Sequence, residues 1–90
     1  MIVSRENIIA ARHPKCSWDA AALSAAIEAR FPGGGDIELA DLIDAWLADP
    51  GLPSGTLIDC AIISSRLAGV RPGRMVLRPA TALARIRATL

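Results

Sequence analysis

The sequence predicts an all-α fold, a compact bundle of four to five short helices, on three observations. The chain has 90 residues, of which 52% are hydrophobic and only 3% aromatic, so aliphatic side chains and alanine must build one small core. Its large apolar residues recur at helical spacing. Proline and glycine residues separate these stretches. We therefore expect a single helical domain over residues 1–90, with room for a small two-stranded ribbon near residues 70–78.

The first two helices are predicted from their caps. Ser4 is a good N-cap for a helix over residues 5–12, which must end before Pro14 because proline disfavours helical geometry in the preceding residue. Ser17 is the expected N-cap of the second helix. Its large apolar residues recur every four positions: Leu23, Ile27 and Phe31. We interpret the glycines at 33–35 as a flexible connector. A phosphate-binding loop would require Gly-Lys-Ser/Thr after them, and this motif is absent from the sequence.

The third helix is predicted over residues 37–48, with Asp36 as its cap. It is amphipathic, with an acidic outer face that carries Glu38, Asp41 and Asp44. Trp46 belongs to its apolar face. We expect Trp46 and Trp18 to lie in the core, although an exposed Trp18 would serve as a binding anchor.

The fourth helix is predicted over residues 57–68. Thr56, with Asp59 three positions later, resembles a capping box at its start. Gly69 suits the left-handed position that often ends a helix. Because this helix is apolar around nearly its whole circumference, we expect it at the centre of the bundle.

The segment after Pro79 fits two structures. Its large apolar residues follow helical spacing: Leu83, Ile86 and Leu90. Residues 84–88 also alternate in polarity, as a strand does. Because alanine favours helices, we predict a helix here. Residues 75–77 form a short apolar run that fits a strand of the ribbon.

Charge along the chain is sorted into blocks. Residues 31–65 contain no Lys or Arg but six acids: Asp36, Glu38, Asp41, Asp44, Asp49 and Asp59. Residues 66–90 contain no acid but six arginines: Arg66, Arg71, Arg74, Arg78, Arg85 and Arg87. The formal charge by block is thus +1, −6 and +6, which sums to the net +1. We expect these charges to be segregated in space as they are along the chain.

The arginine-rich C-terminal segment is the main functional lead, because guanidinium groups bind carboxylates and phosphates with two parallel hydrogen bonds. We expect a small non-enzymatic protein–protein interaction module, of accessory, adaptor or inhibitor type, that binds a protein partner or self-associates. Its candidate contacts are Asp41, Asp44, Arg74, Arg78, Arg85 and Arg87. The alternative is a winged-helix-like nucleic-acid-binding protein. Its phosphate contacts would be Arg66, Arg71, Arg74 and Arg78. A third interpretation pairs these arginines internally with the acidic third helix.

Composition and motifs argue against several other classes. No apolar run approaches the ~20 residues of a membrane-spanning helix, and the first residues do not resemble a signal peptide. We therefore expect a cytoplasmic protein with no membrane contact, from a bacterial or phage genome. Cys16 and Cys60 are interpreted as reduced thiols. Together with His13 they make only three soft ligands, fewer than the four of a structural zinc site. We expect no metal, no cofactor, no catalytic residue and no small-molecule substrate.

Overall fold

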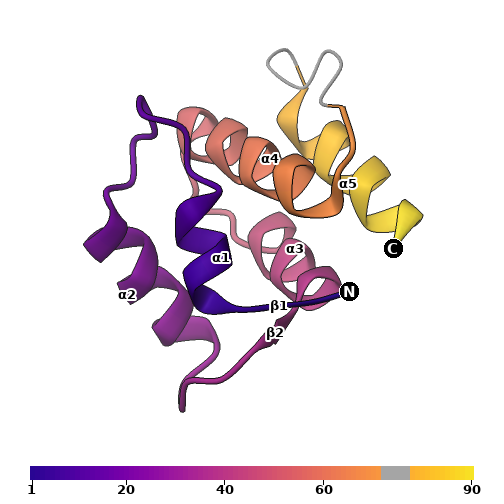
Figure 1. Ribbon diagram of the computed structural model, residues 1–90. Helices are drawn as coiled ribbons and strands as arrows, with labels where there is room; N and C mark the ends of the chain where they lie inside the picture. Colours follow the sequence, from indigo (N-terminus) through magenta and orange to yellow (C-terminus); the bar gives the residue numbers. More distant parts are fainter. Residues whose placement is uncertain (72–77) are drawn as a thin grey trace.

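The computed structural model describes residues 1–71 and 78–90, and these form five helices and a two-stranded ribbon (Figure 1). The helices are α1 (Arg5–Ala10), α2 (Ala20–Arg30), α3 (Leu39–Leu47), α4 (Ser54–Ala68) and α5 (Pro79–Thr89). The strands β1 (Ile2–Val3) and β2 (Ile37–Glu38) are antiparallel. The predicted helical bundle is confirmed. The ribbon predicted near residues 70–78 falls mainly on residues 72–77, outside the described residues, and the described ribbon lies elsewhere.

The first two helices begin at side-chain caps. The Ser4 hydroxyl accepts a hydrogen bond from the Asn7 backbone N–H at 3.1 Å, which confirms Ser4 as the N-cap of α1. The cap of α2 is Asp19, whose Oδ1 accepts from the Ala22 N–H at 2.7 Å. The prediction that Ser17 caps this helix is wrong, because the Ser17 hydroxyl is hydrogen-bonded to Asp59 instead.

The third helix begins two residues later than predicted. Ile37 and Glu38 pair with β1, with Val3 opposite Ile37 and Ile2 opposite Glu38. Residues in this extended pairing cannot also form the first turn of a helix. Downstream, Trp46 is buried in the core and Trp18 packs against it, with ring centroids 6.4 Å apart. The expectation of core membership is confirmed for Trp46, whereas Trp18 is half-buried against the core.

The fourth helix begins at Ser54, three residues earlier than predicted. Asp59 therefore lies in the interior of the helix, and the capping box expected between Thr56 and Asp59 does not form. The end is as predicted: Gly69 has φ +70°, and its N–H donates to the Ser65 carbonyl. The last segment is a helix, as predicted, with Pro79 in its first turn, where a missing N–H costs nothing.

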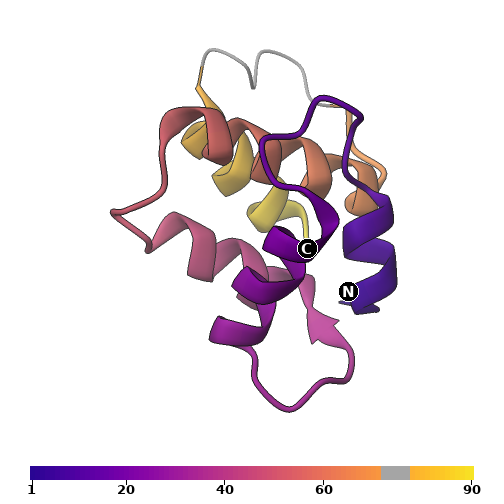
Figure 2. The same ribbon diagram turned by 90° about the vertical axis from the view of Figure 1, so that its left-hand side faces the viewer.

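Helix α4 occupies the centre of the fold, as its apolar circumference predicts. It packs against α1, α3 and α5 (Figures 1 and 2). The largest fully buried apolar side chains come from all five helices: Ile8, Leu23, Leu39, Leu42, Ile43, Ile63 and Leu83. Within residues 1–71 and 78–90, no helix has both the length and the apolar character needed to cross a membrane.

The glycine loop between α2 and β2 is held by Arg5. All three glycines have positive φ, between +73° and +97°. This conformation turns backbone carbonyls toward one guanidinium group, which donates to Phe31 O at 2.6 Å, Gly34 O at 2.9 Å and Gly35 O at 2.7 Å. The same side chain pairs with Glu28 at 3.1 Å. The segment is a connector, as expected, and Arg5 fixes its shape.

Candidate functional site

The first candidate site lies where α3 meets α5. Arg87 Nε donates to Asp44 Oδ1 at 3.0 Å, and 42% and 52% of the two side chains are exposed. Asp41 is exposed one helical turn before Asp44. Three of the residues predicted to bind a protein partner are thus brought together on one side of the molecule.

The other predicted contacts do not join this group. Arg78 and Arg85 are exposed, and neither forms an ion pair within the described part of the chain. Arg85 and Arg87 are two positions apart on α5, which places them roughly 160° apart around the helix axis. Arg74 lies outside the described residues. The six predicted residues therefore do not form one continuous described patch.

Each member of the Asp44–Arg87 pair is followed three positions later by an exposed leucine. Leu47 follows Asp44 by three positions and is 38% exposed, and Leu90 follows Arg87 by three positions and is 40% exposed. Leu47 therefore lies on the same side of α3 as Asp44, whereas Leu90 directly follows the last residue of α5. We call Asp44, Leu47, Arg87 and Leu90 the α3–α5 seam. The N-terminus, with an exposed Met1, lies near the C-terminus in both views (Figures 1 and 2).

The charge blocks are less separated in space than along the chain. Asp49 pairs with Arg30 at 2.7 Å, and Glu38 pairs with the N-terminal amine at 2.6 Å. Both partners come from the first thirty residues. Asp44 pairs with Arg87 from the C-terminal block. Opposite charges therefore lie side by side around α3, and the expected opposed poles are weakened.

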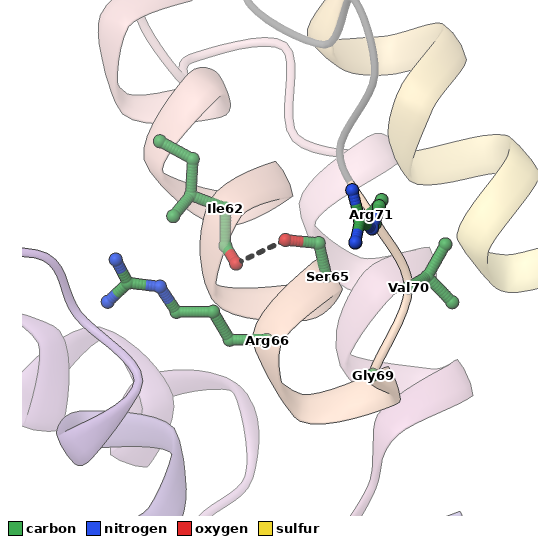
Figure 3. A pocket seen from close by; sticks show the side chains of 6 residues that line it. All are labelled: Ile62, Ser65, Arg66, Gly69, Val70 and Arg71. Atoms are coloured by element: carbon green, nitrogen blue, oxygen red, sulfur yellow. Dashed lines mark hydrogen bonds between the residues drawn. The ribbon is translucent and has the colours of Figure 1, made fainter.

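A second candidate site is a pocket of about 370 Å³ at the C-terminal end of α4 (Figure 3). It is lined by Ile62, Ser65, Arg66, Gly69, Val70 and Arg71. The Ser65 hydroxyl donates to the Ile62 carbonyl at 2.8 Å, so its proton is used within the helix. Arg66 extends toward the N-terminal helices and donates to Ala11 O at 3.1 Å (Figure 3). Two residues predicted to bind nucleic acid thus share one pocket, with Arg66 partly committed to an internal contact.

A third candidate site joins the α1–α2 loop to α4 through Asp59, which is 5% exposed. Its Oδ2 accepts from the Ser17 N–H at 2.9 Å and from the Ser17 hydroxyl at 2.5 Å. Its Oδ1 lies 2.8 Å from His13 Nε2. The Lys15 N–H donates to His13 Nδ1 at 3.2 Å, so Nε2 must carry the proton that Asp59 accepts. Hydrogen bonds to this one buried carboxylate therefore hold the α1–α2 loop against the central helix α4.

The surroundings perturb three ionisable groups at this site. Burial alone would raise the pKa of Asp59, but the hydrogen bonds from Ser17 and His13 outweigh it and lower the pKa below its ordinary 3.8. Burial raises the pKa of the Cys16 thiol, and the nearby Asp59 charge adds to this. Burial also raises the pKa of Cys60. Both thiols therefore stay protonated at neutral pH, which makes them weak nucleophiles.

From the sequence, Asp59 is predicted only as part of a helix cap, and His13 and Cys16 are grouped with Cys60. In the structure one ligand atom from each of His13, Cys16 and Asp59 lies within 4.8 Å of the others. The available signal is that Asp59 is the only acid in a central helix whose other charged residue, Arg66, lies in the last turn. A buried carboxylate needs hydrogen-bond partners from elsewhere in the chain.

Comparisons with protein-family models, with curated proteins and with solved structures give no match for this chain. The three sites are therefore interpreted from their own geometry and chemistry. They are the α3–α5 seam, the pocket at the end of α4, and the cluster around Asp59.

Proposed function

We propose that this protein is a small non-enzymatic protein–protein interaction module that docks through the α3–α5 seam. The supporting observation is that exposed leucines, Leu47 and Leu90, follow the two members of the half-exposed Asp44–Arg87 ion pair by three positions each. Protein interfaces typically combine an apolar centre with a polar rim and are enriched in arginine. On this proposal the two leucines supply most of the affinity.

The charges around the seam would orient the partner. An ion pair as exposed as Asp44–Arg87 contributes at most about 1 kcal/mol to folding, so its members are available to exchange partners. A carboxylate on the docking protein can replace Asp44 at Arg87, and Asp41 can meet a cation of that protein. Such contacts mainly set association rate and specificity. This suits an accessory, adaptor or inhibitor role, and it suits self-association. The free thiols of Cys16 and Cys60 suit a reducing compartment such as the cytoplasm.

The experiment compares two charge insertions. Leu47→Glu places a carboxylate on the seam, whereas Ala25→Glu places one on an exposed position of α2, away from the seam. The native complex is recovered by cross-linking in the host, and the purified protein is examined by sedimentation equilibrium. We expect Leu47→Glu to abolish the cross-linked complex or the dimer and Ala25→Glu to retain it. An unchanged complex in both variants, with circular dichroism showing that they fold, contradicts the proposal.

The alternative function is a winged-helix-like nucleic-acid-binding protein. What supports it is that Arg66 and Arg71 line one pocket. Against it, α4 would be the recognition helix, and it packs against α1, α3 and α5. A gel-shift assay titrated with salt separates the two functions, because the log-log slope is ~0.9 per phosphate neutralised. Binding that weakens with Arg66→Gln and Arg71→Gln supports this alternative, and no shift at low salt with any duplex or single strand removes it.

A further inference from the structure

We propose that His13, Cys16 and Asp59 form a binding site for a zinc-like divalent transition-metal ion. One imidazole nitrogen, one thiol sulfur and one carboxylate oxygen from these residues all lie within 4.8 Å of one another. The sequence suggests His13, Cys16 and Cys60 as soft ligands, and in the proposed site Asp59 takes the place of Cys60. It is also independent of the α3–α5 seam, which involves other residues.

The distances fit a metal after small side-chain movements. Bonds of about 2.0 Å to nitrogen or oxygen and about 2.3 Å to sulfur place tetrahedral ligand atoms about 3.3–3.6 Å apart. The present distance of 2.8 Å between His13 Nε2 and Asp59 Oδ1 is slightly shorter than this. The separations among the three ligand atoms reach at most 4.8 Å, which is somewhat longer. Asp59 is fixed on α4, whereas His13 and Cys16 lie in the loop between α1 and α2 and are only half-buried. The loop can therefore close on the metal while the helix stays in place.

The donor atoms select the class of metal. A thiolate and an imidazole suit zinc or cobalt, whereas magnesium and calcium require oxygen ligands. Ser17 holds Oδ2 of Asp59 with its N–H and its hydroxyl, which leaves Oδ1 for the metal. This outer hydrogen bonding is the kind that orients a metal-binding carboxylate. Three protein ligands leave the fourth tetrahedral position for water or another small ligand.

Metal binding changes the protons at this site in a defined way. The Cys16 thiol must lose its proton to the solvent, and the proton on His13 Nε2 must move to Nδ1. One proton is therefore released for each metal bound. The metal affinity should fall about tenfold for each unit by which the pH is lowered, as long as the free thiol stays protonated. Protonated Nδ1 can no longer accept the Lys15 N–H, which is bonded to it in the present structure. The Lys15 amide should therefore report metal binding directly.

The test uses cobalt and zinc on the full chain under a non-thiol reductant. Cobalt bound through Cys16 gives thiolate charge-transfer absorption, with one ion per chain. Cys16→Ala should abolish this band. Cys60→Ala is the matched control, because Cys60 is the other cysteine and is buried in the core. That variant should keep the band, and zinc should shift the Lys15 amide resonance in the wild type.

Three results would each overturn the proposal. They are a cobalt spectrum without the thiolate band in folded wild-type protein, a band that survives Cys16→Ala, and a band lost only in Cys60→Ala. His13→Gln gives a second readout that leaves the thiol intact, with an expected loss of at least tenfold in zinc affinity. Unchanged affinity in that variant would also overturn the proposal, because His13 would then be only a hydrogen-bond partner of Asp59.

Discussion

Replacing Asp59 with asparagine tests how strongly the loop between α1 and α2 is tied to the central helix. The carboxylate is 5% exposed and accepts hydrogen bonds from the Ser17 N–H, the Ser17 hydroxyl and His13 Nε2. Asparagine keeps the shape and one oxygen but turns the other oxygen into an N–H₂ donor. If the remaining oxygen faces Ser17, the new amide meets the His13 N–H, and two donors oppose each other.

The magnitude follows from this conflict. His13 can relieve it by moving its proton to Nδ1, but Nδ1 then faces the Lys15 N–H that it now accepts. Either the part-buried His13 N–H or the exposed Lys15 N–H therefore loses its partner, at up to about 1–3 kcal/mol, and the bonds that remain lose the assistance of a charge. We expect Asp59→Asn to lower the free energy of unfolding by about 2–3 kcal/mol, or the Tm by ~10–20 °C for a domain of this size.

The dependence on pH has a fixed sign. Because folding lowers the pKa of Asp59 below 3.8, its ionised form stabilises the protein above that pH. The contribution is lost as the pH falls below 3.8 and through the lower pKa of the folded state. Asparagine does not titrate, so the difference between wild type and variant should be full at pH 7 and should shrink below pH 3.8.

Urea unfolding followed by tryptophan fluorescence measures this difference, since Trp18 and Trp46 pack together in the folded protein. The matched control is Asp41→Asn, an exposed acid on α3, which should change stability by less than about 0.5 kcal/mol. If Asp59→Asn is as stable as the control at pH 7, the carboxylate does not hold the loop to the central helix.

Three further predictions concern the rest of the fold. Arg5→Lys keeps the charge but loses the guanidinium group that donates to three backbone carbonyls. Urea unfolding should show that the free energy of unfolding falls by about 1–2 kcal/mol, and equal stability would mean that the charge alone suffices. Gly34→Ala should lower the stability by about 1–2 kcal/mol because Gly34 has φ +73°. Gly55→Ala, in α4 with open space around it, should raise the stability by about 0.4–1 kcal/mol. Thermal melts in which both variants shift the Tm in the same direction would contradict this. Arg87→Gln breaks only an exposed ion pair with Asp44, so it should cost less than about 1 kcal/mol, and the difference should vanish in 1 M salt (about 3 Å screening length).

Signals that act within one helical turn predict much of this fold. Ser4, Gly69 and Pro79 mark helix ends correctly, because a cap or a missing N–H affects only nearby backbone groups. The start of α3 is predicted wrongly because its first two expected residues pair with β1. That partner lies about 35 positions earlier, and two-residue strands carry no periodic signal.

The candidate sites depend on contacts that sequence spacing does not reveal. Asp59 reaches Ser17 and His13 across 42 and 46 positions. The Asp44–Arg87 pair spans 43 positions. Asp44 and Arg87 are correctly identified as surface charges, whereas Asp59 is buried, and which charged groups meet is decided by the packing of the helices. The order of charges along a chain therefore does not predict which charges are neighbours in the folded molecule.

The central position of α4 has a consequence for how the molecule opens. A helix that contacts α1, α3 and α5 cannot separate from one neighbour without loosening the others. Amide protons of Ala61 and Ile63, both fully buried on α4, should therefore exchange with deuterium only when the whole chain unfolds. Helix α2, which packs mainly on α1, can detach at a lower free energy, so its protons should exchange first.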